Sequence, residues 1–225
     1  MNLPKNGSYE LYLVHRRCVM DLSHPAYDLF GRNATRILQR LALVKDGLTG
    51  RRISELSDVP LGSTQRALAH LERTGLVVAQ PAGRAIIYSL SRGHVLWPVV
   101  AAALNAPLQL ERLIAEIVHR HAGNSATVAV YGSFARGEAG PDSDLDVLIV
   151  WEPGISTDDQ AALLDELNDQ LENATGNRVE IVDLSLSDLH RLVAANDPLI
   201  ESWKREAKTL SVGPDIKSLA KNAAA

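Results

Sequence analysis

The sequence has little of several residue types on which stabilising and binding devices depend. Cys18 is the only cysteine among 225 residues, which excludes an internal disulfide and a zinc site built from cysteines. Aromatic residues make up 4% of the chain, so its cores must consist mainly of Leu, Val, Ile and Ala. The most apolar run, Val95–Leu104, contains Pro98 and is too short to span a bilayer. Met1–Glu10 is polar and does not resemble a signal peptide, so we expect a cytoplasmic protein with room for two modest domains.

Charge is distributed unevenly along the chain. Up to Val95 there are 13 Lys and Arg residues against 7 Asp and Glu, whereas from Leu96 onward there are 10 against 20. The formal net charge of −4 therefore hides a basic half and an acidic half. Such an asymmetry indicates different partners for the two halves, with a polyanion as the candidate for the first.

The clearest chemical pattern lies in the stretch Tyr131–Val150, YGSFARGEAGPDSDLDVLIV. A buried strand is predicted to end at Gly132-Ser133, and a second strand, Leu145–Trp151, begins beside two acids. Because strand side chains alternate in direction, Asp144 and Asp146 present two carboxylates on one side while the residue between them faces the core. Paired carboxylates beside a glycine-serine turn suit a Mg²⁺ ion that carries phosphate oxygens.

These residues carry a resemblance to a known family. Gly132-Ser133, ten intervening residues and then Asp144-Leu145-Asp146 resemble the signature of the DNA polymerase β-like nucleotidyltransferase superfamily, and most closely its minimal nucleotidyltransferase branch. The resemblance implies transfer of a nucleoside monophosphate from an NTP, with Mg²⁺ as the cofactor. Nothing in the sequence reads the base, so the choice among ATP, GTP, CTP and UTP is open, with ATP as the expected donor. It also implies that Asp144 and Asp146 are catalytic metal ligands.

The superfamily places a third carboxylate on a later strand, predicted here as Arg178–Leu184. Glu180 shares a strand face with Val182 and is the preferred third catalytic and metal-binding residue, while Asp183 remains the alternative. The candidate nucleotide-binding residues are Gly132, Ser133 and Arg136, with an exposed surface arginine as the alternative interpretation of Arg136. Arg136 lies one helical turn after Ser133, within reach of the same anion.

The basic half has the element order of a winged helix-turn-helix domain. A helix over Pro25–Val44 is followed by a short helix, Arg51–Ser57, and by a helix over Ser63–Thr74 that ends at Gly75. Two short strands, Leu76–Gln80 and Ala85–Leu90, then form a hairpin. This segment resembles bacterial DNA-binding regulators of the winged class.

In such domains the second helix of the pair enters the major groove and the wing touches the DNA backbone or minor groove. The DNA-binding residues that the resemblance implies are Ser63, Thr64, Gln65, Arg66, His70 and Arg84. Ser63 has a second interpretation as a helix N-cap. The winged fold also serves protein–protein contacts, which remains an alternative role for this domain.

The predicted fold class is α+β, with an N-terminal winged helix-turn-helix, a helical linker and a C-terminal mixed sheet flanked by helices. The predicted boundaries are an N-terminal arm over 1–23, the winged domain over 24–93, linker helices over 94–122, the nucleotidyltransferase domain over 123–212 and a loose tail over 213–225. The arm either docks, frays or touches DNA. The linker helices either pack the domains together or form a homodimer interface.

The predicted function is a Mg²⁺-dependent nucleotidyltransferase fused to a DNA-binding module, without a membrane partner. Antitoxin members resemble this stretch, so the acceptor hydroxyl is expected on a protein such as a cognate toxin, or on RNA, and the winged helix would allow autoregulation. One alternative is a transcriptional regulator whose nucleotidyltransferase domain only senses nucleotide. Another is a small-molecule transferase that modifies a hydroxylated antibiotic.

Overall fold

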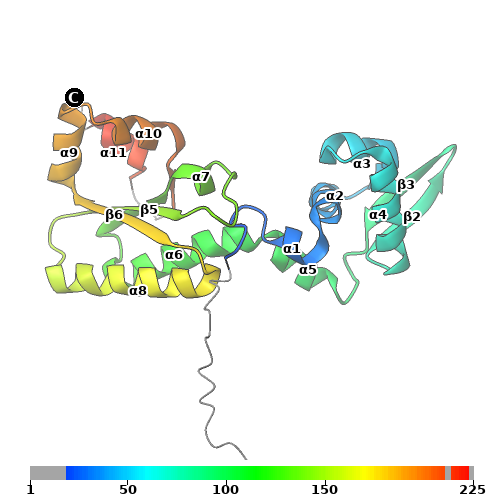
Figure 1. Cartoon of the computed structure of the whole chain (residues 1–225), viewed down its shortest axis with the longest axis horizontal. Coiled ribbons are helices and arrows are strands. Elements are labelled where there is room, and N and C mark those ends of the chain that lie inside the picture. Colours follow the sequence, from blue (N-terminus) through cyan, green and yellow to red (C-terminus); the bar gives the residue numbers. More distant parts are fainter. Residues whose placement is uncertain (1–18, 211–213, 223–225) are drawn as a thin grey trace, which may run out of the picture.

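The structure, a computed structural model, describes residues 19–210 and 214–222 as two lobes that lie side by side (Figure 1). The N-terminal lobe holds α1–α5 and β1–β3, and the C-terminal lobe holds α6–α11 and β4–β7. No helix within the described ranges is long and apolar enough to cross a membrane. The α+β class predicted from the sequence is confirmed, with a mixed sheet in the C-terminal lobe.

The N-terminal lobe is a set of helices beside a small antiparallel sheet of strand order β1-β3-β2. Its elements are α1 (Ala26–Phe30), α2 (Arg32–Ala42), β1 (Leu48–Thr49), α3 (Gly50–Ser57), α4 (Leu61–Arg73), β2 (Val77–Ala82), β3 (Ala85–Leu90) and α5 (Trp97–Leu104). The helix predicted over Pro25–Val44 is divided at Gly31, whose φ of +76° no helical residue adopts. The predicted hairpin is present, with Ala82 paired to Ala85 at its tip.

Aliphatic side chains form the core of this lobe, as the scarcity of aromatics predicts. The buried members are Ile37, Leu38, Leu41, Ile53, Val59, Leu68, Leu71, Leu76, Val77 and Val100. Val100 comes from α5, so α5 packs with the rest of the N-terminal lobe. Leu56 of α3 is 37% exposed, whereas Ile53 of the same helix is fully buried.

The C-terminal lobe is built on a four-stranded sheet of order β6-β5-β4-β7. Its elements are α6 (Ala106–Ala122), β4 (Ala126–Val130), α7 (Gly132–Ala135), β5 (Leu145–Trp151), α8 (Thr157–Thr175), β6 (Val179–Ser185), α9 (Leu186–Ala194), α10 (Pro198–Glu206), β7 (Lys208–Thr209) and α11 (Ile216–Asn222). Strands β5 and β6 are parallel and joined through α8, whereas β4 is antiparallel to both β5 and β7.

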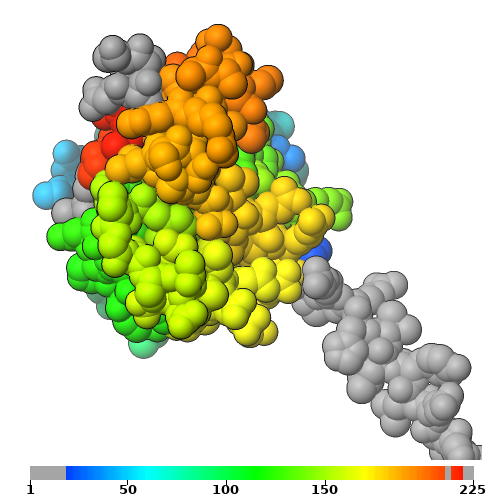
Figure 2. Space-filling view, turned by 90° about the vertical axis from the view of Figure 1, so that its left-hand side faces the viewer, coloured from blue at the N-terminus to red at the C-terminus, as the bar shows by residue number. Residues whose placement is uncertain are grey.

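Helices cover both faces of this sheet. One face packs on α6 and α8 through Leu145, Val147 and Ile149, all fully buried. The other face packs on α9, α10 and α11 through Leu148 and Val150. The strict alternation along β5 therefore serves two cores. In Figure 2, which faces this lobe, the orange residues of α9 and α10 lie above the yellow-green and yellow residues of α8.

Three sequence-based expectations about the connecting segments need correction. Helix α6, predicted as part of a linker, is part of the C-terminal core, because Leu110, Ile114 and Ile117 are buried against α8 and the sheet. The predicted loose tail contains α11, which is anchored by the fully buried Ile216. Strand β7 was not predicted at all, since only two residues pair with β4.

The N-terminal arm enters the described structure at Val19, and residues 1–18 lie outside the described residues. Its described end docks on the C-terminal lobe, where Leu22 is fully buried in the core beneath α6 and α8. Ser23 and Ala139 exchange two hydrogen bonds: the Ser23 amide donates to the Ala139 carbonyl (3.0 Å), and the Ala139 amide donates to the Ser23 hydroxyl (2.9 Å). The arm is thus bonded to the loop around Ala139, far from it in sequence.

Candidate active site

The turn at Gly132 lies directly against the side chain of Asp146. Gly132 has a φ of +65°, and a Cβ placed on it would come within 2.0 Å of Oδ2 of Asp146. The amide of Tyr131 donates a hydrogen bond to the Asp146 carbonyl (3.2 Å), which fixes the two strand ends together. Both the backbone angle and the close approach require glycine here. Helix α7, which follows, is only four residues long.

The acidic residues are arranged by the pairing of β5 with β6. Asp146 is in register with Glu180 on the neighbouring parallel strand, so their side chains leave the same face of the sheet. Asp144 immediately precedes β5, and its charge acts on Asp146. Asp183 pairs in register with Ile149 and accepts a hydrogen bond from the Trp151 indole (2.9 Å). The strand face that carries Asp146 therefore carries Glu180 and not Asp183.

Titration of the site reflects partial burial and crowded negative charge. Burial first, and then the negative charges of Glu180, Asp144 and Glu206, together raise the pKa of the Asp146 carboxyl from 3.8 to about 6, against the opposing charge of Arg136. Burial, together with Asp146 and Glu180, raises the pKa of the Tyr131 hydroxyl to about 12. Tyr131 therefore stays protonated beside the acids, with its ring edge-on to Trp203 (centroids 6.1 Å apart).

Arg136 sits at the end of α7 and is engaged by two carboxylates. Its Nε donates to Glu138 (2.8 Å), and its Nη1 donates to Glu206 of α10. Glu206 also accepts from the Ser202 hydroxyl, and these bonds hold its pKa below the usual value. Glu206 was not identified from the sequence, because only the docking of α10 brings it to a residue 70 positions away.

Asn177 is a second residue that sequence reasoning did not single out beyond its place in a turn. Its side chain is buried, with 1% of the residue exposed. Its Nδ2 donates to the carbonyls of Met20, Pro141 and Ser143 (3.0–3.2 Å), and its Oδ1 accepts from the Met20 amide (3.0 Å). Asn177 therefore fixes the loop that leads to Asp144 and ties it to the N-terminal arm.

Oxygen donors of the kind that Mg²⁺ prefers are present at this end of the sheet. Asp144, Asp146 and Glu180 supply hard carboxylate oxygens, and the raised pKa of Asp146 reports an excess of negative charge that a divalent cation would offset. In the described ranges, however, no three His, Cys, Asp or Glu side chains are gathered tightly enough to hold a metal ion. Glu180 instead forms an ion pair with Arg178 (Nη2 to Oε1, 3.2 Å).

The predicted DNA-binding residues are mostly on the exposed side of α4. Gln65, Arg66 and His70 are exposed, and Arg66 donates to the Ser63 hydroxyl (3.0 Å). Thr64 is wrongly placed by the prediction: it is fully buried and its hydroxyl donates to the Val59 carbonyl (3.1 Å).

The remaining two positions of that set concern the helix start and the wing. The interpretation of Ser63 as an N-cap is wrong, because α4 begins two residues earlier, at Leu61. Arg84 is exposed in the turn between β2 and β3, at the tip of the wing.

Comparison with known proteins agrees with both lobes. Residues 110–209 match the sequence model of the nucleotidyltransferase domain family. Residues 32–81 match that of the IclR helix-turn-helix domain. The first match begins within α6, consistent with the burial of that helix in the C-terminal core. No curated protein matches the chain.

Solved structures with a similar region include a toxin–antitoxin complex with AMP-PNP, which is 19% identical, covers 50% of this chain and 82% of that one, and has a TM-score of 0.36. A structure described as a minimal nucleotidyltransferase is 33% identical over 46% of this chain and 92% of that one, with a TM-score of 0.33.

Proposed function

We propose that this protein is a Mg²⁺-dependent enzyme that transfers a nucleoside monophosphate from an NTP to an acceptor hydroxyl. The chain joins a helix-turn-helix domain to a nucleotidyltransferase domain, which is an enzyme domain of the transferase class. One observation carries the proposal: the side chain of Asp146 lies against the turn at Gly132, and Asp146 is in register with Glu180. The contact is so close that a Cβ on Gly132 would lie 2.0 Å from Oδ2 of Asp146. This places carboxylates beside a backbone turn that a phosphate can approach closely.

Asp144 and Asp146 would hold Mg²⁺, with Glu180 joining them after leaving Arg178; the bound ion would neutralise charge on the triphosphate as the reaction proceeds. Gly132 and Ser133 orient the β- and γ-phosphates through backbone N–H groups and the serine hydroxyl. If Asp144 and Asp146 hold the ion without Glu180, Glu180 is instead the general base that accepts the proton of the acceptor hydroxyl. The new bond forms between the acceptor oxygen and the α-phosphorus, while the bond to the β-phosphate oxygen breaks and pyrophosphate leaves.

Arg136 contributes by exchanging partners. Its guanidinium is 42% exposed and is held at the site by Glu138 and Glu206. A triphosphate carries more negative charge than a single carboxylate, so it would compete with the exposed Glu138 for the guanidinium. Glu206, which is 7% exposed, would retain its bond and keep Arg136 aimed at the phosphates.

For the N-terminal lobe we propose DNA binding through Ser63, Gln65, Arg66 and His70 of α4, with Arg84 of the wing touching the backbone or minor groove. A basic DNA-binding lobe joined to a transferase fits an antitoxin that represses its own promoter and adds a nucleotide to a cognate toxin or to RNA. A protein that uses both DNA and NTP would act in the cytoplasm, and a homodimer would match a two-fold operator.

The transfer reaction is tested with purified protein, Mg²⁺ and each of four α-³²P-labelled NTPs, alone and with host lysate. We expect a labelled protein or RNA species with wild type, strongest with ATP, and none with the Asp144→Ala/Asp146→Ala variant or in EDTA. Label that persists in the double variant would refute the site. Mg²⁺-NTP binding without any transfer would favour a nucleotide-sensing regulator, and label on an aminoglycoside would favour the antibiotic-modifying class.

The DNA-binding role is tested by affinity for the protein's own promoter at fixed salt. Gln65→Ala with Arg66→Ala should weaken binding by about 30-fold or more, because each of two lost base contacts contributes about 1–3 kcal/mol and about 1.4 kcal/mol is a factor of ten. Arg73→Ala, an exposed change on the last turn of α4, is the matched control. Equal affinities for all three proteins would assign the winged lobe to protein contact instead.

A further inference from the structure

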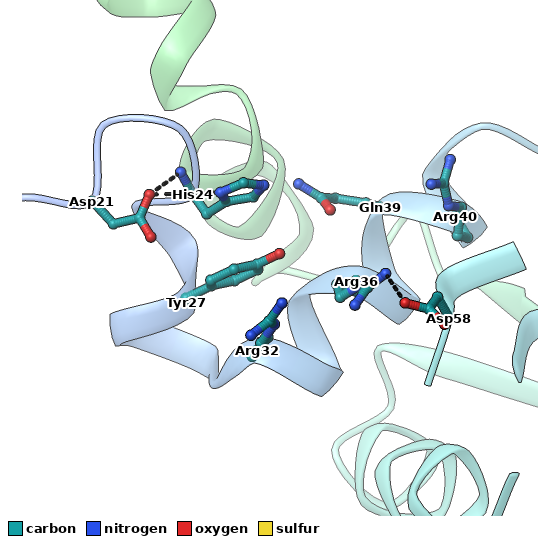
Figure 3. A pocket seen from close by; sticks show the side chains of 8 residues that line it. All are labelled: Asp21, His24, Tyr27, Arg32, Arg36, Gln39, Arg40 and Asp58. Atoms are coloured by element: carbon teal, nitrogen blue, oxygen red, sulfur yellow. Dashed lines mark hydrogen bonds and ion pairs between the residues drawn. The ribbon is translucent and has the colours of Figure 1, made fainter. Parts of the chain in front are cut away.

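A polar cavity of about 490 Å³ lies in the N-terminal lobe, away from the candidate active site (Figure 3). It is bounded by the end of the N-terminal arm, α1, α2 and the end of α3. The side chains that line it are those of Asp21, His24, Tyr27, Arg32, Arg36, Gln39, Arg40 and Asp58. The volume is within the range of small-molecule sites, and neither the transfer reaction nor the recognition helix uses it.

Three of the lining residues are arginines spaced four apart on α2. Arg32, Arg36 and Arg40 therefore lie on one side of the helix, where like charges one turn apart are mutually destabilising. Arg36 donates to Asp58 (3.1 Å). Arg40 makes no hydrogen bond or ion pair within the described residues. The arrangement leaves uncompensated positive charge on one wall, and guanidinium groups of this kind bind phosphate bidentately.

The opposite end of the cavity has a different chemistry. The rings of His24 and Tyr27 stack, with centroids 4.5 Å apart and planes at 12°, and the guanidinium of Arg32 lies 5.9 Å from the Tyr27 centroid. Asp21 accepts from the His24 amide (2.6 Å) and retains a second carboxylate oxygen. The Gln39 amide lies across the cavity from this end (Figure 3). Together these groups offer a π surface, an acceptor and an amide.

We propose that this cavity binds a mononucleotide, with its phosphates on the arginines of α2 and its base at the end formed by Asp21, His24 and Tyr27. Phosphate oxygens accept hydrogen bonds from the arginines of α2, of which the protein itself pairs Arg36 with Asp58. The exocyclic amine of a base donates to Asp21, and aromatic side chains bind the faces or edges of bases. The site is separate from the one proposed for transfer, and its existence does not depend on that function.

A DNA backbone is a poorer occupant of the same cavity. Asp21 and Asp58 stand at its two ends and would repel a phosphate chain that runs through it. A mononucleotide is short enough to place its negative charge among the arginines and its neutral base beside Asp21. The recess is also bounded on several sides, whereas groove-binding surfaces meet DNA with protruding helices and wings.

An occupant of this cavity would act on the candidate active site through the N-terminal arm. Asp21 and His24 flank Ser23, which is bonded to Ala139 in the loop between α7 and β5. Met20, one residue earlier, is bonded to Asn177, which holds the carbonyls of Pro141 and Ser143 in the same loop. The arm that lines the cavity is therefore hydrogen-bonded, directly and through Asn177, to the loop that carries Asp144.

The test is calorimetric titration of ATP into full-length protein carrying Asp144→Asn and Asp146→Asn, in EDTA, so that metal-dependent binding at the transfer site does not contribute. We expect one binding event. Arg36→Gln/Arg40→Gln in this background should raise the Kd by about tenfold or more, since hydrogen bonds to charged groups are lost. Arg51→Gln/Arg73→Gln removes the same charge from exposed positions and should leave the Kd unchanged.

Two further probes separate the parts of the ligand. Adenosine and tripolyphosphate should each bind more weakly than ATP, and Asp21→Asn should weaken ATP but not tripolyphosphate. Arg40→Gln alone guards against misfolding, because this side chain has no partner within the described residues, and it should also weaken ATP binding. Equal affinities for tripolyphosphate and ATP would overturn the proposal. So would a protein that does not bind ATP and whose DNA binding is weakened by Arg40→Gln, because the cavity would then contact the DNA backbone.

Discussion

Replacement of Gly132 by alanine tests the geometry on which the candidate active site depends. The backbone φ of +65° costs a residue with a Cβ about 1–2 kcal/mol. The added methyl would also lie 2.0 Å from Oδ2 and 3.0 Å from Cγ of Asp146, so the carboxylate must move. Overpacking of this kind costs about 1–3 kcal/mol more. We therefore expect Gly132→Ala to lower the free energy of unfolding of the C-terminal lobe by about 2–5 kcal/mol.

Gly137→Ala is a matched control in the same segment. Gly137 has a similar φ of +72°, but a Cβ there would meet nothing within 4 Å. Its cost should therefore be the backbone contribution of about 1–2 kcal/mol alone. The difference in free energy of unfolding between the two variants isolates the contact with Asp146 and should be about 1–3 kcal/mol. Each kcal/mol corresponds to roughly 2–4 °C in Tm.

The assay is urea unfolding followed by tryptophan fluorescence, because Trp151 and Trp203 are buried in the C-terminal lobe and report its transition. Nucleotide transfer is measured beside it. Displacement by about 1 Å of the carboxylate that we propose as a metal ligand should reduce transfer about 100-fold in Gly132→Ala. Equal stability and equal activity of the two variants would show that Gly132 does not face Asp146, and would refute the arrangement of the site.

Three other outcomes follow from the same contacts. Because the pKa of Asp146 is raised to about 6, the folded state binds more protons than the unfolded state between about pH 4 and pH 6 and loses stability as pH rises through this range. Without metal, Asp146→Asn should therefore unfold at a higher Tm than wild type at pH 8; a lower Tm would contradict the pKa. Glu180→Gln should abolish label transfer while Asp183→Asn retains it, and the reverse result would assign the third carboxylate to Asp183. Asn177→Ala should lower the free energy of unfolding by about 2–5 kcal/mol, since it leaves several buried backbone groups unpaired; a fluorescence transition at the wild-type urea concentration would refute the role of this side chain.

Local sequence was sufficient for the elements with strong periodicity. The strand Leu145–Trp151 was predicted with the bounds that the structure has, because an unbroken apolar pattern marks it. Helix α8 has local end signals that are equally clear. Ser156 caps the helix with a bond from the Asp159 amide, and Gly176 ends it in the left-handed conformation. The two domain types also followed from sequence, through the resemblance of short motifs to known families.

Elements held by long-range contacts could not be predicted in this way. Strand β7 has two residues and exists only because β4 offers a free edge. Among the side chains of α11 that the structure describes, residues 216–219, Ile216 alone is fully buried, which is too little to give a periodic pattern. Thr64 sits among exposed neighbours on α4, but the packing of that helix under Val59 turns it inward.

The sequence by itself determined the chemistry on offer: Gly132-Ser133, Asp144 and Asp146 occupy adjoining strand ends, and strand alternation already places the two acids on one side. Only the tertiary structure decided what surrounds them. The register of β5 with β6 sets Glu180 beside Asp146, and the docking of α10 brings Glu206 to Arg136. The burial of Asn177 joins the arm to the loop before Asp144. Local periodicity specifies an element and its faces, whereas pairing between distant segments depends on how whole surfaces pack.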